Sequence, residues 1–597
     1  MFVAFLTGLA LGAELHVPGQ YSTIQSAIVA ASDGDVVIVS PGTYTGSIDF
    51  LGKAITVRST NPVDDVVRDS SVIRASEGKA CVTFQGGETA RCVLAGLTIF
   101  LGVINCTASS PIIERNKIGP YGASITCSQS SATIRNNLFI PYNSRQYTIT
   151  CLDSAVTIEG NTIYGNKLAG YEQPGAIIIG GGVSGGTSVI AGNQIIGRGA
   201  KIASAIYLVP GEASAVIRGN LIADWTKGGW PGVVIASFES FSASSSGDLI
   251  IDGNVIADNT GMVAIYDESW ANTAIIRNTI SANAAGVILG SLADRPLVQG
   301  NTIIGNSLDG ASSPHTIYPL VLSNTIAGNQ RYGINVYRTL HGGVFADNLI
   351  VGNGGNWGCG VMFTDSSVLF AGNTVVGNKA RSGGGGLQFL TGVSGATHPI
   401  RNCIVWGNRA PEGSSIAVGY ARPEVSHCSV QGGLTGVAKE GTAEFTWGPG
   451  NIDADPLFVD PGRWDDPGTP TYQWDDSFIL GDYHLLPGSP CIDGGTNDVD
   501  NPDTTEIETL PDTDIAGQPR VIDGNLDGAA TVDIGAYEYL PGDVNYDGRV
   551  NVLDLILVRN SLGRDPASSI EARKADVNAD GAVNVQDMIM VRGQLAK

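Results

Sequence analysis

Residues 299–306 read QGNTIIGN, and variants of this phrase return along the chain as EGNTIYGN at 159–166, DGNVIADN at 252–259 and AGNTVVGN at 371–378. Its leading asparagine falls at Asn116, Asn137, Asn161, Asn193, Asn220, Asn254, Asn278, Asn301, Asn324, Asn348, Asn373 and Asn402. The basic spacing is about 24 residues with occasional insertions, which is typical of one turn of a solenoid. The sequence therefore predicts an all-β solenoid whose short strands pair in parallel with their copies in the next turn.

Asparagines and cysteines at fixed places in the repeat have structural explanations. Asparagine tolerates a left-handed turn, and stacked side chains can hydrogen-bond between turns, so we expect a structural column. Cys106, Cys127 and Cys151 take one equivalent place in three successive repeats, and the cysteines number 9, an odd count. A metal site is one explanation, but the pattern favours an inward stack of small apolar side chains. One cysteine per repeat with no histidine nearby is not typical of zinc.

Charge and hydropathy indicate an exported protein. The net charge of −23 argues against binding to nucleic acid, because an acidic surface repels phosphates. Residues 1–13, MFVAFLTGLALGA, have the character of a signal peptide and are too short to span a bilayer. We expect a secreted protein, extracellular or associated with the cell surface, with no transmembrane segment once the signal is removed.

The segment after the signal peptide is expected to cap the solenoid. STIQSAIVAASDGD at 22–35 predicts a short helix with Ser22 as its N-cap and with Ile24 and Ile28 on one face. GDVVIVSPGTY at 34–44 resembles the opening of bacterial pectate-lyase-like proteins, and pectin methylesterases start similarly. The resemblance implies a right-handed parallel β-helix, which we place at 14–440.

A second composition begins near residue 440, where the asparagine repeat stops and Asp, Pro, Gly and Trp increase. We expect a separate module at 441–540, which resembles a C-terminal module of many secreted bacterial β-helix proteins. Inside it, DGNLDG places Asp523, Asn525 and Asp527 at alternating positions before Gly528. Such spacing can hold calcium, but Ile534 stands where an acidic twelfth residue would be, so an Asp-rich turn and a metal site both remain open.

Two twelve-residue loops, DVNYDGRVNVLD from Asp543 and DVNADGAVNVQD from Asp576, lie in the last segment, 541–597. Calcium prefers six or more oxygen ligands from a tightly turned loop, and Gly548 and Gly581 stand where the chain must turn. We expect two Ca²⁺ ions, with ligands at positions 1, 3, 5, 7, 9 and 12, where position 7 uses its backbone carbonyl. These residues are Asp543, Asn545, Asp547, Arg549, Asn551 and Asp554, then Asp576, Asn578, Asp580, Ala582, Asn584 and Asp587.

The duplicated loop and helix pattern is similar to type I dockerins, small α-helical domains that fold around calcium and bind cohesin-bearing scaffolds. The resemblance implies a cohesin-like scaffold or a cell-surface protein as partner. In many dockerins small hydroxyl residues near the end of each loop face the cohesin. Here those places hold Val552, Leu553, Val585 and Gln586, so the sequence departs from the dockerin pattern at the positions that face the cohesin but not at the calcium ligands.

The groove where β-helix enzymes hold their active site lacks paired carboxylates in this sequence. Strand alternation predicts an outward set of Tyr207, Val234, Ala264, Tyr266, Ile288, Asn335, Tyr337, Met362, Thr364, Gln388 and Leu390. Glycosidases need two carboxyl groups, and the motifs of polygalacturonases, pectate lyases and pectin methylesterases are missing. The remaining candidate catalytic residues follow the outward strands: Asp267, Glu268, Arg338 and Asp365. An exposed ion pair between Arg338 and Asp365 is the simpler explanation for those two.

Aromatic side chains are candidates for stacking on sugar rings. We select Trp225, Trp230, Tyr266, Trp270 and Tyr337, although packing of loops onto the solenoid explains them equally well. Two hypotheses follow. The chain is either a polysaccharide-directed enzyme, a lyase or a glycoside hydrolase, attached through its calcium module, or a non-catalytic solenoid that binds glycans or adheres to surfaces.

Overall fold

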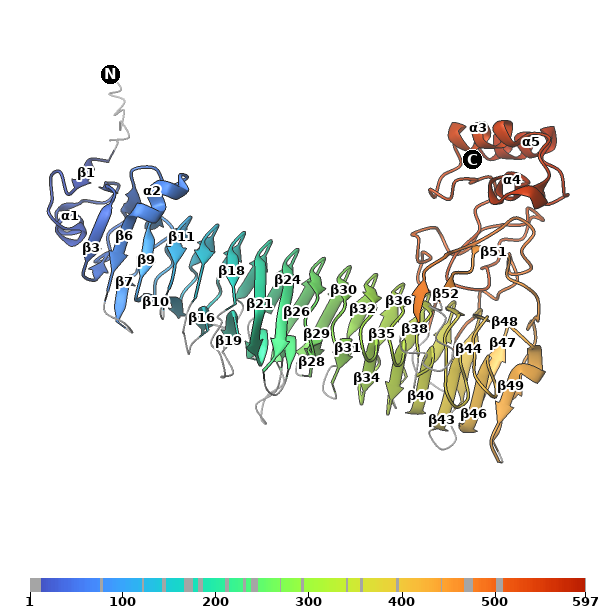
Figure 1. Ribbon diagram of the computed structural model, residues 1–597. Coiled ribbons are helices and arrows are strands. Elements are labelled where there is room, and N and C mark those ends of the chain that lie inside the picture. The colour runs from blue at the N-terminus through green and yellow to red at the C-terminus, as the bar shows by residue number, and fades with distance from the viewer. Residues whose placement is uncertain are drawn as a thin grey trace, which may run out of the picture. The chain divides into compact units, whose positions relative to one another are not determined.

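A computed structural model describes residues 12–595, and the segments outside the description are 76–78, 121–122, 142–146, 166–174, 181–185, 210–213, 229–231, 238–244, 269, 291–294, 340–341, 355–357, 393–396, 442, 466–475 and 501–507. The chain divides into two compact units, Met1–Thr273 and Ala274–Lys597. In both units, strands of successive turns stack in parallel, as predicted (Figure 1). No helix in the described ranges is long and apolar enough to cross a membrane.

Three parallel sheets, here called A, B and C, form the wall of the first unit. Sheet A contains β1 (Glu14–Val17), β2 (Val36–Val39), β5 (Thr56–Ser59), β8 (Val93–Ala95), β11 (Ile112–Glu114), β14 (Thr133–Arg135), β17 (Thr157–Glu159), β20 (Thr187–Ala191), β23 (Ser214–Arg218) and β26 (Ser245–Asp252). Sheet B contains β3 (Gly42–Thr45), β6 (Ser71–Arg74), β9 (Thr98–Phe100), β12 (Lys117–Ile118), β15 (Leu138–Phe139), β18 (Thr162–Tyr164), β21 (Gln194–Ile202), β24 (Leu221–Lys227) and β27 (Val255–Ala257). Sheet C contains β4 (Ile48–Asp49), β7 (Ala80–Phe84), β10 (Val103–Thr107), β13 (Ser124–Ser128), β16 (Ile149–Leu152), β19 (Ile177–Gly180), β22 (Ser204–Val209), β25 (Val233–Ser237) and β28 (Val263–Asp267).

The same three sheets occur in the second unit. Sheet A contains β29 (Trp270–Ile276, which spans the boundary), β32 (Leu297–Gln299), β35 (Leu320–Leu322), β38 (Val344–Ala346), β41 (Leu369–Ala371), β44 (His398–Arg401), β47 (Pro423–Ser426) and β50 (Thr446–Trp447). Sheet B contains β30 (Thr279–Ser281), β33 (Thr302–Ile304), β36 (Thr325–Ala327), β39 (Leu349–Val351), β42 (Thr374–Val376), β45 (Ile404–Trp406) and β48 (Ser429–Val430). Sheet C contains β31 (Ala285–Leu289), β34 (Ala311–Pro314), β37 (Ile334–Tyr337), β40 (Val361–Ser366), β43 (Leu387–Gly392), β46 (Ile416–Tyr420) and β49 (Val437–Lys439).

Helix α1 (Ile24–Ala30) forms where the sequence predicted it and packs against β1, β2 and β4. Its N-cap is Thr23 rather than Ser22. The Thr23 side chain accepts a hydrogen bond from the backbone N–H of Ser26, and the Ser26 side chain accepts one from the backbone N–H of Thr23. A second helix, α2 (Asp65–Ser70), was not expected and is capped by Asp64.

The asparagine column is structural, but the left-handed residue is its neighbour. Asn301 Nδ2 donates to Asn324 Oδ1 at 2.9 Å and to the carbonyl of Ile275 at 2.8 Å. The residue before each ladder asparagine, such as Gly300 with φ 63°, takes the left-handed conformation. Asn402 was assigned to this column wrongly. Ile404 pairs with Thr374, so Cys403 occupies the ladder position and Asn402 the left-handed one, with φ 53°.

Cys106, Cys127 and Cys151 form the inward stack that the sequence favoured. Cys106 is in register with Cys127, and Cys127 with Cys151. All three thiols are buried, at 1% exposure or less. They therefore fill the core of sheet C among isoleucines.

Residues after 450 pack on the outside of sheet B in the second unit. Phe458, Tyr483 and Leu485, which lie in the hairpin of β51 (Phe458–Asp460) and β54 (Asp482–Leu485), pack with Leu349 and Val351 in one hydrophobic cluster. A second hairpin, β52 (Arg463–Asp465) with β53 (Ser477–Ile479), brings Trp464 Nε1 within 2.7 Å of the carbonyl of Gly377. A one-turn 3-10 helix, η1 (Gly433–Gly436), precedes this segment.

The C-terminal helices form a small core of their own. Helices α3 (Val552–Ser561), α4 (Ile570–Ala575) and α5 (Val585–Gln594), with the 3-10 turn η2 (Pro566–Ser568), lie close together (Figure 1). Val558, Ala572 and Val591 are fully buried between them. Asn551 and Asn584 are the N-caps of α3 and α5, so each helix starts from the end of a twelve-residue loop.

Candidate functional site

The candidate carboxylate Asp267 was expected just after its strand, but it is the last residue of β28 and its side chain lies in the core. It is in register with Ser237, which pairs with Leu208, and it is 0% exposed. Its carboxylate accepts a hydrogen bond from Thr273 Oγ1 at 2.6 Å. Strand alternation explains the error, because Tyr266 points outward and its neighbour must point inward. Glu268, one residue further, is half-buried, and its backbone N–H donates to Ser237.

The last three residues of the outer row of sheet C in the first unit are aromatic or small. Tyr207, Ala236 and Tyr266 follow one another in register and pack with Val233 and Val263. Burial, followed by the nearby carboxylate of Glu268, raises the pKa of Tyr266 to about 12. Tyr266 is therefore neutral at physiological pH.

Several predicted outward or sugar-stacking residues do not lie in an open groove. Val234 and Ala264 are fully buried. Trp225 is 2% exposed, and its indole N–H donates to the carbonyl of Ile195 at 3.3 Å, so its ring packs the core and cannot stack on a sugar. Trp230 and the side chain of Trp270 lie outside the described residues.

In the second unit, His315, Arg338 and Asp365 occupy one column on three successive turns. They follow Pro314, Tyr337 and Thr364, which are in register. All three adopt left-handed backbone, with φ of 58°, 53° and 47°. We call His315, Tyr337, Arg338 and Asp365 the Arg338 cluster.

The contacts within the Arg338 cluster are loose and open to solvent. Arg338 Nε lies 3.7 Å from Asp365 Oδ2, and its guanidinium lies 5.1 Å from the centre of the Tyr337 ring. The His315 ring meets the same tyrosine edge-on at 5.1 Å. Sequence reasoning missed His315, although it stands directly after a sheet C strand just as Arg338 does. The cluster offers a cation, an imidazole and an aromatic edge in one place.

Paired carboxylates are absent from the outer row of sheet C in the second unit. The described residues of this row, in register, are Ile288, Ser312, Asn335, Met362, Gln388 and Ala417. Hydrolysis of glycosides uses two carboxyl groups on either side of the bond, and this part of the described surface does not supply them.

The two twelve-residue loops fold alike. In the first, Asp543 accepts the backbone N–H groups of Asp547 at 3.2 Å and Gly548 at 2.8 Å. In the second, Asp576 accepts those of Asp580 at 3.1 Å and Gly581 at 3.0 Å. Gly548 and Gly581 have φ of 83° and 87°, a left-handed conformation that suits glycine.

The twelfth residue of each loop turns back into it. Asp554 is 0% exposed and accepts the backbone N–H groups of Val544 at 2.9 Å and Asn551 at 2.8 Å. Asp587 is equally buried and accepts those of Asn578 and Asn584. Each of these carboxylates is therefore folded back into its own loop, on the side where the other acidic side chains of that loop lie.

The oxygen donors of these loops fit a hard cation. Burial, together with the negative charges of Asp554 and Asp547, raises the pKa of Asp543 to about 6. Within the described ranges no Lys or Arg forms an ion pair with these carboxylates. A cluster of carboxylates and amides without a protein cation matches what Ca²⁺ binds.

The Asp-rich turn at 523–528 is closed by its own backbone. Asp523 accepts the N–H of Gly528 at 3.0 Å, and Asn525 accepts that of Asp527 at 2.9 Å. The same two bonds occur in the first loop, where Asp543 accepts the N–H of Gly548 and Asn545 that of Asp547, so they fit a calcium loop as well as an Asp-rich turn. What this turn lacks is an acidic twelfth residue, because Ile534 stands there.

Comparison with known proteins agrees with both parts of this architecture. Residues 541–596 match the dockerin type I domain model, and residues 236–380 match the model of the right-handed beta helix region. Dockerin type I domains bind calcium in general. No curated protein matches the chain.

Similar solved structures include a periplasmic alginate epimerase, AlgG, at 14% identity, covering 60% of this chain and 78% of that one, with a TM-score of 0.34. An alpha-1,3-glucanase from Streptomyces thermodiastaticus is 13% identical, with coverages of 72% and 65% and a TM-score of 0.31. PfbA, a surface adhesin of Streptococcus pneumoniae, is 10% identical, with coverages of 77% and 94% and a TM-score of 0.28. At these values the three structures do not decide between an enzyme and an adhesin. The chain is thus a right-handed parallel β-helix that carries a dockerin type I domain at residues 541–596.

Proposed function

We propose that this chain is a secreted, polysaccharide-directed β-helix protein that binds a cohesin-like scaffold or surface protein through two calcium ions in its dockerin domain. The observation that carries the proposal is the matched geometry of the two loops. Asp543 and Asp576 each close a six-residue turn onto a left-handed glycine, and Asp554 and Asp587 each fold back from the first turn of a helix.

Each loop would hold one ion through its side-chain oxygens and the backbone carbonyl of its seventh residue, Arg549 or Ala582. The bound ion would neutralise the carboxylates that otherwise repel one another. Because Asp554 and Asp587 lie in the first turns of α3 and α5, the ion would also fix the start of each helix.

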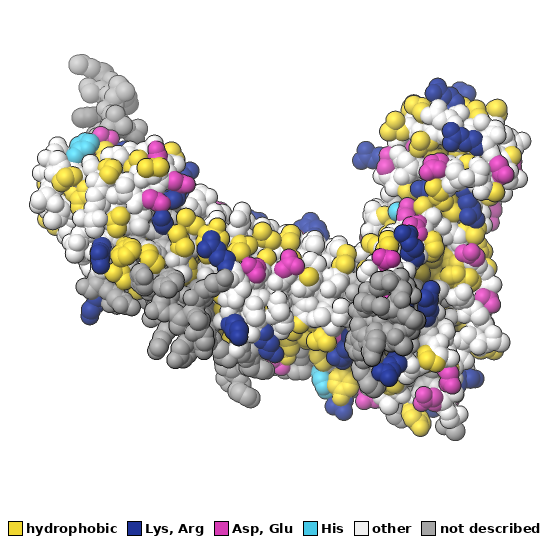
Figure 2. All heavy atoms as spheres, in the orientation of Figure 1, with side chains coloured by type: hydrophobic (Ala, Val, Ile, Leu, Met, Phe, Trp, Pro, Cys, Tyr) yellow, Lys and Arg dark blue, Asp and Glu magenta, His cyan; other side chains and the backbone are white. Residues whose placement is uncertain are grey.

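The partner is expected to bind the exposed ends of α3 and α5. Val552 is 61% and Leu553 57% exposed at the start of α3, and Val585 is 62% and Ile589 63% exposed on α5. Figure 2 shows hydrophobic and basic side chains together on the surface of this helical domain. Exposed apolar side chains at equivalent positions on two helices favour a protein partner with an apolar surface.

The Arg338 cluster favours an acidic polysaccharide. A guanidinium binds a carboxylate through two parallel hydrogen bonds, and a tyrosine ring supplies an apolar surface beside it. The cluster contains one permanent cation, Arg338, and binding of a sugar carboxylate would require Asp365 to release it. We propose a uronic-acid polymer as ligand, bound locally at Arg338 against the net charge of −23, with non-catalytic binding as the alternative to elimination by a lyase.

The test is product release and binding on a panel of neutral and uronic polysaccharides, with calcium and with chelator. Ultraviolet absorbance of unsaturated uronates together with new reducing ends would identify a lyase, and reducing ends alone a hydrolase. Retention of the protein without product would identify a glycan-binding solenoid. Neither retention nor product on any polymer would contradict the polysaccharide part of the proposal.

A further inference from the structure

The tips of the two dockerin loops touch the segment that precedes the domain in the chain. Tyr546 and Ala579 are the fourth residues of their loops, and both have left-handed backbone, with φ of 57° and 53°. Tyr546 reaches residues 482–485, and Ala579 lies against Gly488, where an added Cβ would be 2.9 Å from the alanine Cβ. We call these contacts the loop-tip interface.

Tyr546 is the anchor of the loop-tip interface. Its hydroxyl donates to the carbonyl of Leu485 at 3.0 Å, and its ring lies 4.9 Å from the ring of His484. His484 in turn packs at 4.3 Å from the ring of Tyr537 and bonds Asp482 at 2.6 Å. A tyrosine with a satisfied hydroxyl and stacked neighbours is typical of a specific contact rather than of a loop tip in water.

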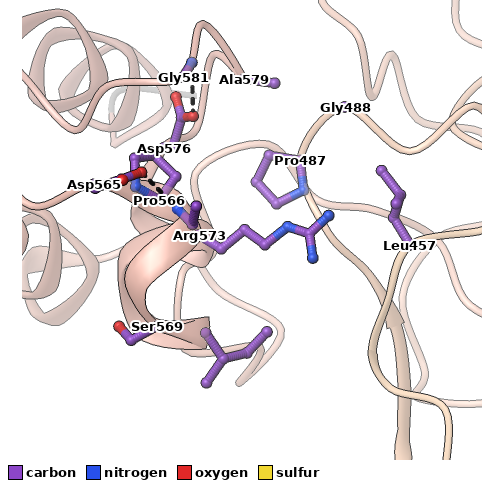
Figure 3. Close-up of a pocket in the computed structure, with 12 residues that line it drawn as sticks. Leu457, Pro487, Gly488, Asp565, Pro566, Ser569, Arg573, Asp576, Ala579 and Gly581 are labelled. Carbon is purple, nitrogen blue, oxygen red and sulfur yellow. Dashed lines mark hydrogen bonds between the residues drawn. The ribbon is translucent and has the colours of Figure 1, made fainter.

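Charge adds to the same contact. Lys574, near the end of α4, places its ammonium 4.5 Å from the centre of the Tyr546 ring and 3.9 Å from Asp482 Oδ2. Beside it lies a cavity of about 770 Å³, lined by Leu457, Pro487 and Gly488 on one side and by α4 and the second loop on the other. Figure 3 shows Arg573 extending from α4 toward Pro487 in this space.

We infer that calcium controls the attachment of the dockerin domain to the rest of the protein as well as its folding, through the loop-tip interface. The inference rests on the calcium binding proposed above. The fourth position of each loop is left-handed because the turn closes between its first and sixth residues, through the bonds from Gly548 to Asp543 and from Gly581 to Asp576. Without the ion, the carboxylates of Asp543, Asp547 and Asp554 repel one another, the loop opens and Tyr546 leaves its contact with Leu485.

The interface leaves the proposed partner surface open. Val552 and Val585, at the helix ends, remain more than half exposed while the loop tips are covered. The calcium-loaded domain would therefore present its partner surface in one orientation to the β-helix. Without calcium, the domain would be held to the rest of the protein only by the connecting residues 540–542.

The experiment uses the full chain and two variants on opposite sides of the interface. Tyr546→Ala gives the first loop the residue that the second loop carries at the same position with nearly the same φ, so calcium binding is retained. Asp482→Asn removes the partner of Lys574 and lies far in sequence from both loops. Arg592→Ala, at an exposed site on α5 outside the proposed partner surface, is the control.

Calcium affinity is measured by calorimetry, and attachment by the rate at which chymotrypsin cuts at Tyr539 and Leu540, detected as release of the C-terminal fragment. Tyr539 is 6% exposed in the intact protein. With saturating calcium, we expect chymotrypsin to cut both variants about five-fold faster than the wild type, because each variant loses one hydrogen bond or ion pair of the interface. The control should be cut at the wild-type rate. Chelator should accelerate cutting of the wild type.

Cutting of calcium-loaded Asp482→Asn at the wild-type rate would overturn the inference, whatever Tyr546→Ala does. Failure of the wild type to bind calcium would instead overturn the proposed function. The two failures are distinguished because calorimetry reports the ion and proteolysis reports the attachment.

Discussion

Arg338 Nε lies 3.7 Å from Asp365 Oδ2 on the neighbouring turn of the solenoid, and the two side chains are 49% and 38% exposed. An ion pair this open contributes little to folding, about 0 to 1 kcal/mol. We therefore predict that Arg338→Ala lowers the free energy of unfolding by less than about 1 kcal/mol. The affinity of the Arg338→Ala variant for a uronic polymer should be about ten-fold lower than that of the wild type, because the variant loses a charged hydrogen bond to the polymer.

The matched control for that variant is Arg422→Ala, because Arg422 is 47% exposed and pairs with Glu444 at 3.1 Å elsewhere in the same unit. Affinity electrophoresis in polymer-containing gels measures the binding of both. Equal losses of binding in the two variants would mean that only the general charge of the surface matters.

Asp267 should behave as a core residue. Its carboxylate is 0% exposed and bonded to Thr273, so Asp267→Ala removes one partner of a buried contact. We predict a loss of about 2–4 kcal/mol in the free energy of unfolding, measured by urea titration. Calcium-loaded protein that remains folded should bind polymers as the wild type does. A variant of normal stability that has lost binding or turnover would return Asp267 to the list of catalytic candidates.

His398 should make the second unit sensitive to acid. It is 2% exposed beside the stacked rings of Phe363 and Phe389, at 5.7 Å and 5.3 Å from their centres, and burial lowers its pKa to about 4. The unfolded value is about 6.5, so the unfolded chain binds this proton first as the pH falls. The contribution of neutral His398 to the free energy of unfolding is fully present above pH 6.5. It is lost as the pH falls from about 6.5 to 4, and the loss is roughly 3 kcal/mol.

His398→Phe keeps an aromatic ring in that place and removes the titration. We predict that the free energy of unfolding of this variant falls less steeply than that of the wild type between pH 6.5 and 4, with equal slopes above pH 7. Denaturant unfolding at several pH values measures this. Parallel curves over the whole range would show that other groups dominate.

The repeat in the sequence was sufficient to predict the turns and their parallel pairing, because each turn must satisfy the same hydrogen bonds as the last. Which side chains face inward was harder to predict, since one residue of error in a strand reverses every side chain. Asp267 was expected beyond the end of a strand whose last, inward-facing residue it is, and Asn402 was assigned to a position that Cys403 occupies. Trp225 stands at the last position of the repeat phrase, where the next turn has the buried Asn259, and its backbone N–H donates to Asn259 Oδ1 at 3.2 Å. Comparison of the repeats could therefore have predicted its burial.

Contacts between distant segments could not be read from the repeat. Leu221 is 37% exposed on sheet B, whereas Leu349, at the equivalent place in another turn, is 3% exposed beneath residues 458–485. The His315 position also depends on pairing, because only the register of β34 with β37 aligns it with Arg338. The calcium loops were predictable because all of their donors lie within twelve consecutive residues.

Calcium binding by the dockerin domain is measured by calorimetric titration of the full, chelator-treated chain, with circular dichroism recorded in parallel. We expect two ions per chain for the wild type and one for Asp587→Asn, because this change removes the buried carboxylate of the second loop. Helical signal from α3 and α5 should rise as the ions bind. A wild-type chain that binds no calcium, or whose helices form fully without it, would show that the two loops are not calcium sites.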